Sequence, residues 1–288
     1  MNVLRARVLG FCMGVRRAVD TAAREAQNVS PVYTLGPLIH NPKVLSELKA
    51  LGVNALEADK IPNESGCSII IRAHGISPNL EIALREKDAH IIDATCPNVK
   101  ANQIKAEELS RAGYCLFLAG EAKHAEIIAI KGYAKSSDNS WCEVVGNSRE
   151  AGKEAKKLYN INPDVKTALL GQTTISEEEY KSIEDAIRLF FPNLEVIQTI
   201  CAATKERQNA LKELLDHVQA VIIAGGRESA NTNRLLEIAI ASGKHCVLTQ
   251  SADEIPAEFY NYETIGLCAG ASTPDSVIDE IENKLKGK

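Results

Sequence analysis

The 288-residue sequence predicts an α/β fold built from three related domains. Short apolar runs of strand type alternate with amphipathic stretches of helix type, an order typical of parallel or mixed sheets covered by helices. One plan also recurs three times, in ARVLGFCMGVRRAVDTAAREA (6–26), HIIDATCPNVKANQIKAEELS (90–110) and EVIQTICAATKERQNALKELL (195–215). In each copy a short strand-type run leads to a cysteine, and the cysteine leads into a helix.

The second unit of each repeat is a strand, a glycine-containing loop and a helix. These units cover residues 33–48, 116–130 and 221–238. In the loops, His40, His124 and Ser229 each lie 28 positions after the cysteine of their own repeat, which is Cys12, Cys96 or Cys201. An identical offset in three places indicates structurally equivalent positions.

The third unit of each repeat is a strand followed by a turn and a helix, over residues 68–84, 167–183 and 264–281. A serine in each turn is placed to cap the helix: Ser77 precedes Pro78, Ser176 precedes three glutamates, and Ser272 lies two residues before Pro274. A serine cap followed by proline or glutamate in the first turn is a helix-start pattern.

The repeats predict domains of residues 13–96, 97–197 and 198–288, with the N-terminal strand 1–12 joined to the third. In parallel sheets, ligands bind beyond the carboxyl ends of the strands, at helix N-termini. All nine loops described above are of that kind. We therefore expect a trefoil in which three βα domains, related by a pseudo-threefold axis, turn these loops toward a common centre.

Composition narrows the class of protein. The net charge is −5 and no basic block is present, which argues against a nucleic-acid partner. No apolar stretch approaches the roughly 20 residues that span a bilayer, so we expect no membrane partner. Glycines interrupt the N-terminal apolar segment, and Arg16 and Arg17 close it, which does not fit a signal peptide. We expect a cytoplasmic protein.

The eight cysteines contain no C-x-x-C pair. Cys12, Cys96 and Cys201 occupy equivalent positions at predicted helix N-termini, where the helix dipole favours the thiolate. Three thiolates fit a structural or catalytic zinc ion, or a [4Fe–4S] cluster with one iron lacking a protein ligand. We expect the other five cysteines to be packing residues: Cys67, Cys115, Cys142, Cys246 and Cys268. A role as a fourth ligand is left open for Cys268.

The inward loops also carry a set of polar residues, which are His40, His74, His124, Glu126, Thr173, Ser229, Asn231 and Ser272. Such groups at helix N-termini suit a bound anion such as phosphate, to which histidines can add charge-assisted hydrogen bonds. Helix capping and ordinary surface or core histidines are the alternatives. Beside an anion and a cluster, Glu126 would have a raised pKa and could carry a proton.

Nine motifs carry a resemblance to one family. They are GFCMGVRRA, HNPKV, RAHGIS, DATCPNVK, GEAKHAEI, GQTTIS, ICAATKERQ, GGRESANTNRL and AGASTPD. In this order and spacing the chain resembles the 4-hydroxy-3-methylbut-2-enyl diphosphate reductases, the iron–sulfur enzymes of the last step in the methylerythritol phosphate route to isoprenoids. The resemblance extends from about residue 3 to the C-terminus.

The resemblance implies one [4Fe–4S] cluster per chain at the centre of the trefoil, held by Cys12, Cys96 and Cys201, with the substrate hydroxyl at the open iron. Glu126 would deliver protons, and Thr173 would orient both Glu126 and the substrate hydroxyl. His124 would belong to the same group of catalytic residues. Residues expected to bind the substrate are His40, His74, His124, Thr173, Ser229, Ala230 through its backbone, Asn231 and Ser272.

The implied reaction uses two electrons and two protons to remove the hydroxyl as water, giving isopentenyl and dimethylallyl diphosphate. The expected electron donor is a ferredoxin or a flavodoxin. The chain departs from the usual family pattern at Ala125, where proline is common, and at Ala230, where serine is usual. The first change predicts a looser helix start, and the second predicts a weaker diphosphate site.

Three other interpretations remain open from the residues. An iron–sulfur redox sensor or electron carrier without a diphosphate substrate would explain the three cysteines, but not the repeated polar loops. A zinc hydrolase with three cysteine ligands is the second. A threefold structural scaffold is the third, and it leaves the inward-facing polar groups without a role.

Overall fold

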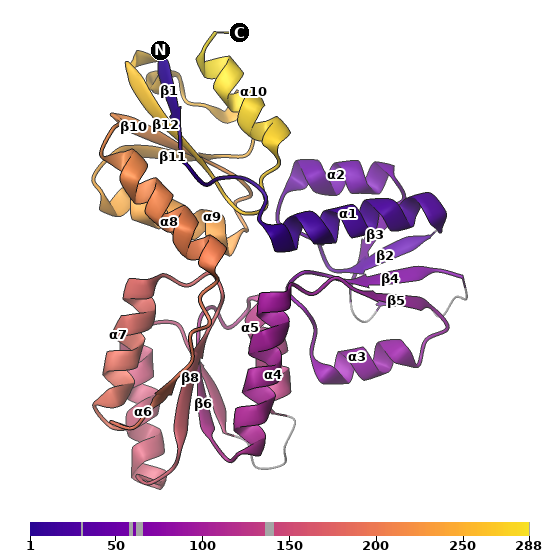
Figure 1. Cartoon of the computed structure of the whole chain (residues 1–288), viewed down its shortest axis with the longest axis vertical. Coiled ribbons are helices and arrows are strands. Elements are labelled where there is room, and N and C mark those ends of the chain that lie inside the picture. Colours follow the sequence, from indigo (N-terminus) through magenta and orange to yellow (C-terminus); the bar gives the residue numbers. More distant parts are fainter. Residues whose placement is uncertain (30, 58–59, 62–65, 136–140, 288) are drawn as a thin grey trace. The chain divides into compact units, whose positions relative to one another are not determined.

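The computed structural model describes residues 1–29, 31–57, 60–61, 66–135 and 141–287. In these residues twelve strands form three four-stranded sheets, and every strand pair is parallel (Figure 1). The α/β class and the organisation into three sheets are confirmed. The chain divides into two compact units, which are residues 1–23, 37–52 and 202–288, and residues 24–36 and 53–201.

The second unit contains two of the sheets. In its first sheet the strand order is β3 (Val53–Leu56), β2 (Val32–Leu35), β4 (Ser68–Ile71), β5 (His90–Asp93). Helix α3 (Pro78–Arg85) covers one face through Leu84, which packs with Ile69 and Ile71. On α1 (Met13–Asn28), Glu25 accepts a hydrogen bond of 2.6 Å from the hydroxyl of Ser68.

The other sheet of the second unit is covered by helices on both faces. Its strand order is β7 (Cys142–Val145), β6 (Cys115–Ala119), β8 (Thr167–Gly171), β9 (Glu195–Val196). Helices α4 (Pro97–Arg111) and α5 (Ala125–Ala134) bury one face, and α6 (Ser148–Ile161) and α7 (Glu177–Arg188) bury the other (Figure 1). Both central strands are therefore buried along almost their whole length, as expected for a parallel sheet.

The first unit contains the third sheet, in the order β1 (Asn2–Arg5), β12 (Thr264–Ala269), β10 (Ala220–Ala224), β11 (His245–Thr249). Helices α8 (Ala202–Leu215) and α9 (Ala230–Ala241) bury one face. Helix α10 (Asp275–Leu285) and the 3₁₀ turns η2 (Ala252–Glu254) and η3 (Ala257–Asn261) bury the other. Helix α2 (Pro42–Ala50) also belongs to this unit.

The predicted succession of cysteine and helix is confirmed at all three sites, because α1, α4 and α8 begin immediately after Cys12, Cys96 and Cys201. The N-terminal strand predicted within residues 1–12 is present but shorter than expected. Strand β1 ends at Arg5, and Val8 and Leu9 instead pack irregularly against the core. Strand β1 pairs in parallel with β12, while the domain boundaries given above stay a prediction.

Of the three predicted serine caps, one is confirmed. The hydroxyl of Ser176 accepts a hydrogen bond of 3.1 Å from the backbone N–H of Glu179. Ser77 occupies the N-cap position of α3, but its side chain makes no capping bond, so that prediction is wrong in its contact. The prediction for Ser272 is wrong in position, because the N-cap residue of α10 is Pro274.

Helix α5 packs against α3 within the second unit at a glycine. A Cβ atom on Gly132 would lie 2.6 Å from the Cβ and 3.2 Å from the Cα of Ser77. Because real Cβ contacts are longer than this, a side chain at position 132 would push the two helices apart. Helices α3 and α5, which cover different sheets, therefore touch at this glycine.

Candidate active site

Each of the three repeated cysteines makes the same backbone hydrogen bond. Its N–H donates to a carbonyl in the loop that follows the third strand of a repeat: Cys96 to Ala73 at 3.0 Å, Cys201 to Thr173 at 3.1 Å, and Cys12 to Ala271 at 3.1 Å. The first two bonds lie in the second unit and the last in the first unit. The cysteines are thereby tied to the loops that carry His74, Thr173 and Ser272.

Two of the sulfur atoms have hydrogen-bond donors directed at them. The backbone N–H of Val15 lies 3.5 Å from Sγ of Cys12, and Nδ2 of Asn98 lies 3.1 Å from Sγ of Cys201. All three repeated cysteines are half-buried, and none of them forms a disulfide among the described residues. N–H donors near a cysteine sulfur suit a metal-bound sulfur, whose negative charge they offset.

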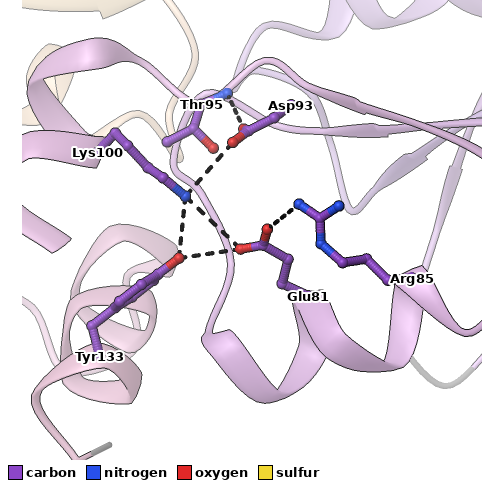
Figure 2. A network of polar contacts seen from close by, with 6 residues as sticks. All are labelled: Glu81, Arg85, Asp93, Thr95, Lys100 and Tyr133. Atoms are coloured by element: carbon purple, nitrogen blue, oxygen red, sulfur yellow. Dashed lines mark hydrogen bonds and ion pairs between the residues drawn. The ribbon is translucent and has the colours of Figure 1, made fainter. Parts of the chain in front are cut away.

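A network of ion pairs and hydrogen bonds holds the loop that contains Cys96 (Figure 2). Asp93 accepts a 2.9 Å hydrogen bond from the backbone N–H of Thr95. Nζ of Lys100 lies 3.7 Å from the carboxylate of Asp93 and donates to the hydroxyl of Tyr133 at 3.2 Å. The same ammonium lies 3.8 Å from Glu81, so α3, α4 and α5 meet around one lysine.

Glu126 is a buried carboxyl group, 1% exposed, in the first turn of α5. Thr173 donates to both of its oxygens, through the backbone N–H at 2.8 Å and through the hydroxyl at 2.8 Å. Burial raises the pKa of Glu126 to about 7, although both hydrogen bonds from Thr173 act to lower it. Burial alone therefore raises this pKa, while the further rise expected beside an anion and a cluster stays a prediction.

His124 caps α5 through its ring. Its Nδ1 accepts a 3.2 Å hydrogen bond from the backbone N–H of Glu126, so in the neutral ring the proton is on Nε2. The ring of His74 packs edge-on against it, with centroids 5.2 Å apart. The helix starts at Ala125 with its cap in place, so the absence of proline there does not leave the helix start uncapped.

The first unit brings together the loops of His40, Ser229 and Ser272. The hydroxyl of Ser272 donates to the backbone carbonyl of His40 at 3.4 Å. A Cβ atom on Gly226 would overlap that same carbonyl, so the absence of a side chain at 226 lets the two loops touch. The hydroxyl of Ser229 caps α9 by accepting from the N–H of Thr232 at 3.3 Å.

Asn231 lies in the first turn of α9, next to Ala230. It is 5% exposed, and neither its side-chain nitrogen nor its side-chain oxygen has a hydrogen-bond partner among the described residues. A buried amide without partners costs free energy of about 1–3 kcal/mol. A helix N-terminus with such a donor suits an anionic ligand, because an oxyanion would pair with the nitrogen.

The site residues thus form two sets. The second unit carries His74, Cys96, His124, Glu126, Thr173 and Cys201, and the first unit carries Cys12, His40, Ser229, Ala230, Asn231 and Ser272. The sequence interpretation missed Asn98 and Lys100. Both lie in the first helical turn after Cys96, a position that could have drawn attention to them. Lys100 donates its backbone N–H to the carbonyl of Cys96 at 2.9 Å.

The remaining cysteines divide by burial. Cys67, Cys142 and Cys268 are buried in apolar surroundings, as predicted, whereas Cys115 and Cys246 are only half-buried. Burial raises the pKa of Cys268 to about 12, which keeps it a thiol and favours packing over a role as fourth ligand.

Within the described residues, no group of three or more His, Cys, Asp or Glu side chains is assembled closely enough to hold a single metal ion. Among the described helices, none combines the length and the apolar character required to cross a bilayer.

The sequence model of the family described as LytB protein matches residues 3–286. The chain is 43% identical to the 4-hydroxy-3-methylbut-2-enyl diphosphate reductase of Treponema denticola, over 99% of both chains. A solved structure described as this reductase, the terminal enzyme of the non-mevalonate pathway, is 36% identical with a TM-score of 0.72 and full coverage of both chains. The solved structure of the reductase from Plasmodium falciparum is 26% identical, with a TM-score of 0.90, and covers 98% of this chain and 87% of its own. The chain belongs to the LytB protein family.

Proposed function

We infer that this chain is a 4-hydroxy-3-methylbut-2-enyl diphosphate reductase that works in the last step of the non-mevalonate route to isoprenoids. One molecule of substrate, two electrons and two protons give one isopentenyl or dimethylallyl diphosphate and one water. The observation that carries the proposal is the hydrogen-bonded series Glu126–Thr173–Cys201, which connects a protonatable buried carboxyl group to a candidate metal ligand.

Cys12, Cys96 and Cys201 would hold one [4Fe–4S] cluster at the centre of the predicted trefoil. The donor set supports this, because three cysteines outside any disulfide lie at helix N-termini and N–H groups point at two of the sulfurs. When bound, the cluster supplies electrons and one iron without a protein ligand that can act as a Lewis acid toward the substrate hydroxyl. A cluster of four irons is wide enough that its three thiolates need not touch.

The substrate's diphosphate would bind the helix N-termini of α5 and α9. Asn231 offers a buried amide that lacks a partner among the described residues. Ser229 and Ala230 precede it at the start of α9, and Ser272 belongs to the same unit. In the second unit, His124 would donate to the diphosphate through Nε2, because its Nδ1 accepts the capping bond. His40 and His74 would complete the set, and charge-assisted bonds from histidine to phosphate are short and strong.

Glu126 would deliver the proton that converts the leaving hydroxyl into water. A pKa of about 7 leaves the carboxyl group protonated in a large fraction of molecules near neutral pH. Thr173 holds both carboxyl oxygens, so the orientation of the acid is set before the substrate binds. The hydroxyl of Thr173 would also be the group that contacts the substrate hydroxyl.

The electrons would come from a ferredoxin or a flavodoxin. No disulfide joins the eight cysteines, all of which lie among the described residues, and a reducing compartment such as the cytoplasm is the expected location. The roles proposed for the site residues do not depend on which protein donates the electrons or on the compartment.

The direct test is an assay of anaerobically purified and reconstituted protein with the hydroxylated diphosphate and dithionite-reduced methyl viologen. We expect both isopentenyl and dimethylallyl diphosphate, with two viologens oxidised per product formed. A protein that contains the cluster and oxidises viologen, but neither binds the diphosphate nor forms product, would be an electron carrier and would contradict the proposal.

A further inference from the structure

The amide side chain of Asn98 contacts the sulfur of a cysteine 103 residues away. Its Nδ2 lies 3.1 Å from Sγ of Cys201, and both residues belong to the second unit. This is the one hydrogen bond of the Asn98 side chain within the described residues. The amide nitrogen can only donate and a thiolate can only accept, so the amide is oriented to stabilise negative charge on Cys201.

Both partners are held in place by contacts of their own. Asn98 is the second residue of α4, whose start is fixed by the bond from Cys96 to Ala73 and by the network around Lys100 (Figure 2). On the other side, the backbone of Cys201 is fixed by its bond to Thr173. Because hydrogen bonds fix the backbones of both residues, the fold places the amide of Asn98 next to the sulfur of Cys201.

We propose that Asn98 is a positioning residue that raises the reduction potential of the cluster held by Cys201, an inference that rests on the proposed function. Hydrogen bonds to the sulfurs are among the factors that set the potential of an iron–sulfur cluster. Each electron added makes the cluster and its thiolates more negative. A donor on Cys201 therefore stabilises the reduced form more than the oxidised form.

Cys12 and Cys201 differ in whether a substitution can remove the hydrogen-bond donor to the sulfur. The donor to Cys12 is the backbone N–H of Val15, which any residue at position 15 supplies, proline excepted. The donor to Cys201 is a side chain, so its contribution is set by the residue at position 98. Asn98 is also exposed, which makes substitutions there compatible with folding.

The test compares midpoint potentials of anaerobically reconstituted protein, measured by dithionite titration with the electron paramagnetic resonance signal of the reduced cluster. Asn98→Leu removes the donor at nearly constant volume, and Asn98→Asp replaces it with a negative charge. The matched control is Asn209→Leu, which removes an exposed amide on α8 that makes no hydrogen bond to a cysteine sulfur within the described residues. The midpoint does not depend on how much of the protein carries the cluster.

We expect Asn98→Leu to lower the ratio of reduced to oxidised cluster about tenfold at a fixed potential, a shift of about 59 mV for one electron. Asn98→Asp should lower it further, even though an acidic residue in the first turn stabilises the helix start. Asn209→Leu should match the wild type.

Unchanged midpoints in both Asn98 variants would overturn the inference and leave the proposed function standing. A wild-type protein that takes up no cluster would overturn the proposed function and this inference together. A drop of equal size in Asn209→Leu would also overturn the inference, because it would assign the effect to the loss of any surface amide.

Discussion

The backbone carbonyl of Thr173 accepts a hydrogen bond of 3.1 Å from the N–H of Cys201. The same threonine donates twice to Glu126, so one residue contacts both the candidate metal ligand and the candidate acid. The bond to Cys201 uses only the backbone of Thr173, whereas Glu126 is bonded by both the backbone N–H and the hydroxyl. A substitution at position 173 therefore removes only the hydroxyl bond to Glu126 and keeps the bond to Cys201.

Replacing Glu126 with glutamine should abolish proton delivery and leave the fold intact. The amide is close in shape and needs no desolvation of charge. We expect turnover to fall by about 100- to 10,000-fold, the range of general acid catalysis, with iron content and substrate affinity near those of the wild type. Single-turnover assays and calorimetric titration with the diphosphate separate the two effects. Turnover at the wild-type rate would remove Glu126 from the reaction.

The activity of the wild type should fall as pH rises through about 7, because the acid form of Glu126 is then lost. The hydroxyl of Thr173 bonds to the carboxylate and acts to lower the pKa of Glu126. Thr173→Val removes that bond but keeps the backbone one, so the pKa should rise and the fall in turnover should move to higher pH. Profiles of turnover against pH for both proteins check the direction, and a shift to lower pH would contradict the cause assigned here.

The same pKa makes a prediction about stability. A folded-state pKa raised from 4.5 to about 7 means that the folded protein keeps a proton that the unfolded chain has lost in that window. The free energy of unfolding should therefore decrease as pH rises from about 4.5 to beyond 7, and Glu126→Gln should remove this part of the dependence. Urea unfolding of the reconstituted protein at several pH values provides the measurement. Parallel curves for wild type and variant would contradict it.

Asn231→Ala should affect binding and stability in opposite ways. The side-chain amide has no partner among the described residues, so its loss should leave the free energy of unfolding unchanged or increase it. Loss of a charge-assisted bond to the diphosphate should weaken binding about 10- to 100-fold. Asn28→Ala, at the exposed end of α1, is the matched control and should bind normally. A stability loss with normal binding would place the role of Asn231 in folding.

Ala230→Ser restores the hydroxyl that the family usually carries at this position. Ala230 is the first residue of α9, so the added group lies where an anion at the helix N-terminus would meet it. We expect substrate affinity to rise by about 2- to 10-fold, the effect of one hydrogen bond. Calorimetric titration decides the matter, and an unchanged affinity would show that the backbone N–H already suffices.

Gly132→Ala should destabilise the contact between α3 and α5 by about 1–3 kcal/mol, because the new methyl group would overlap Ser77. The matched control is Gly152→Ala on α6, where the nearest atom to the new Cβ is 4.0 Å away. That change should stabilise the protein by about 0.5–1 kcal/mol through helix propensity. Thermal unfolding of both variants tests the prediction, and equal effects would contradict the assigned contact.

The sequence predicted those parts of the structure that depend on local order along the chain. The start of α4 after Cys96 follows from Pro97 and the polar run behind it. The common offset of 28 positions from a cysteine predicted equivalent positions for His124 and Ser229, and both are the N-cap residues of their helices. A buried pair such as Glu126 and Thr173 came from the family resemblance, since no local pattern specifies a contact between residues 47 positions apart.

Other features depend on contacts that no local pattern encodes. The amide of Asn98 meets Cys201 across 103 residues, and Ser77 fails to cap α3 although its sequence context is that of a cap. Strand β1 ends at Arg5 because pairing with β12 stops there, while the apolar residues that follow pack without a strand partner. These differences come from tertiary packing, which overrides local propensity.

The most direct test is the iron and acid-labile sulfide content of anaerobically prepared protein, in the wild type and in Cys12→Ser, Cys96→Ser and Cys201→Ser. The wild type should carry one cluster of four irons and four sulfides per chain, and each of the three variants should lose most of it. Cys268→Ser, at a buried thiol in the core, should retain the cluster if the variant folds. Zinc without sulfide in the wild type, or a full cluster in any of the three variants, would contradict the shared cluster.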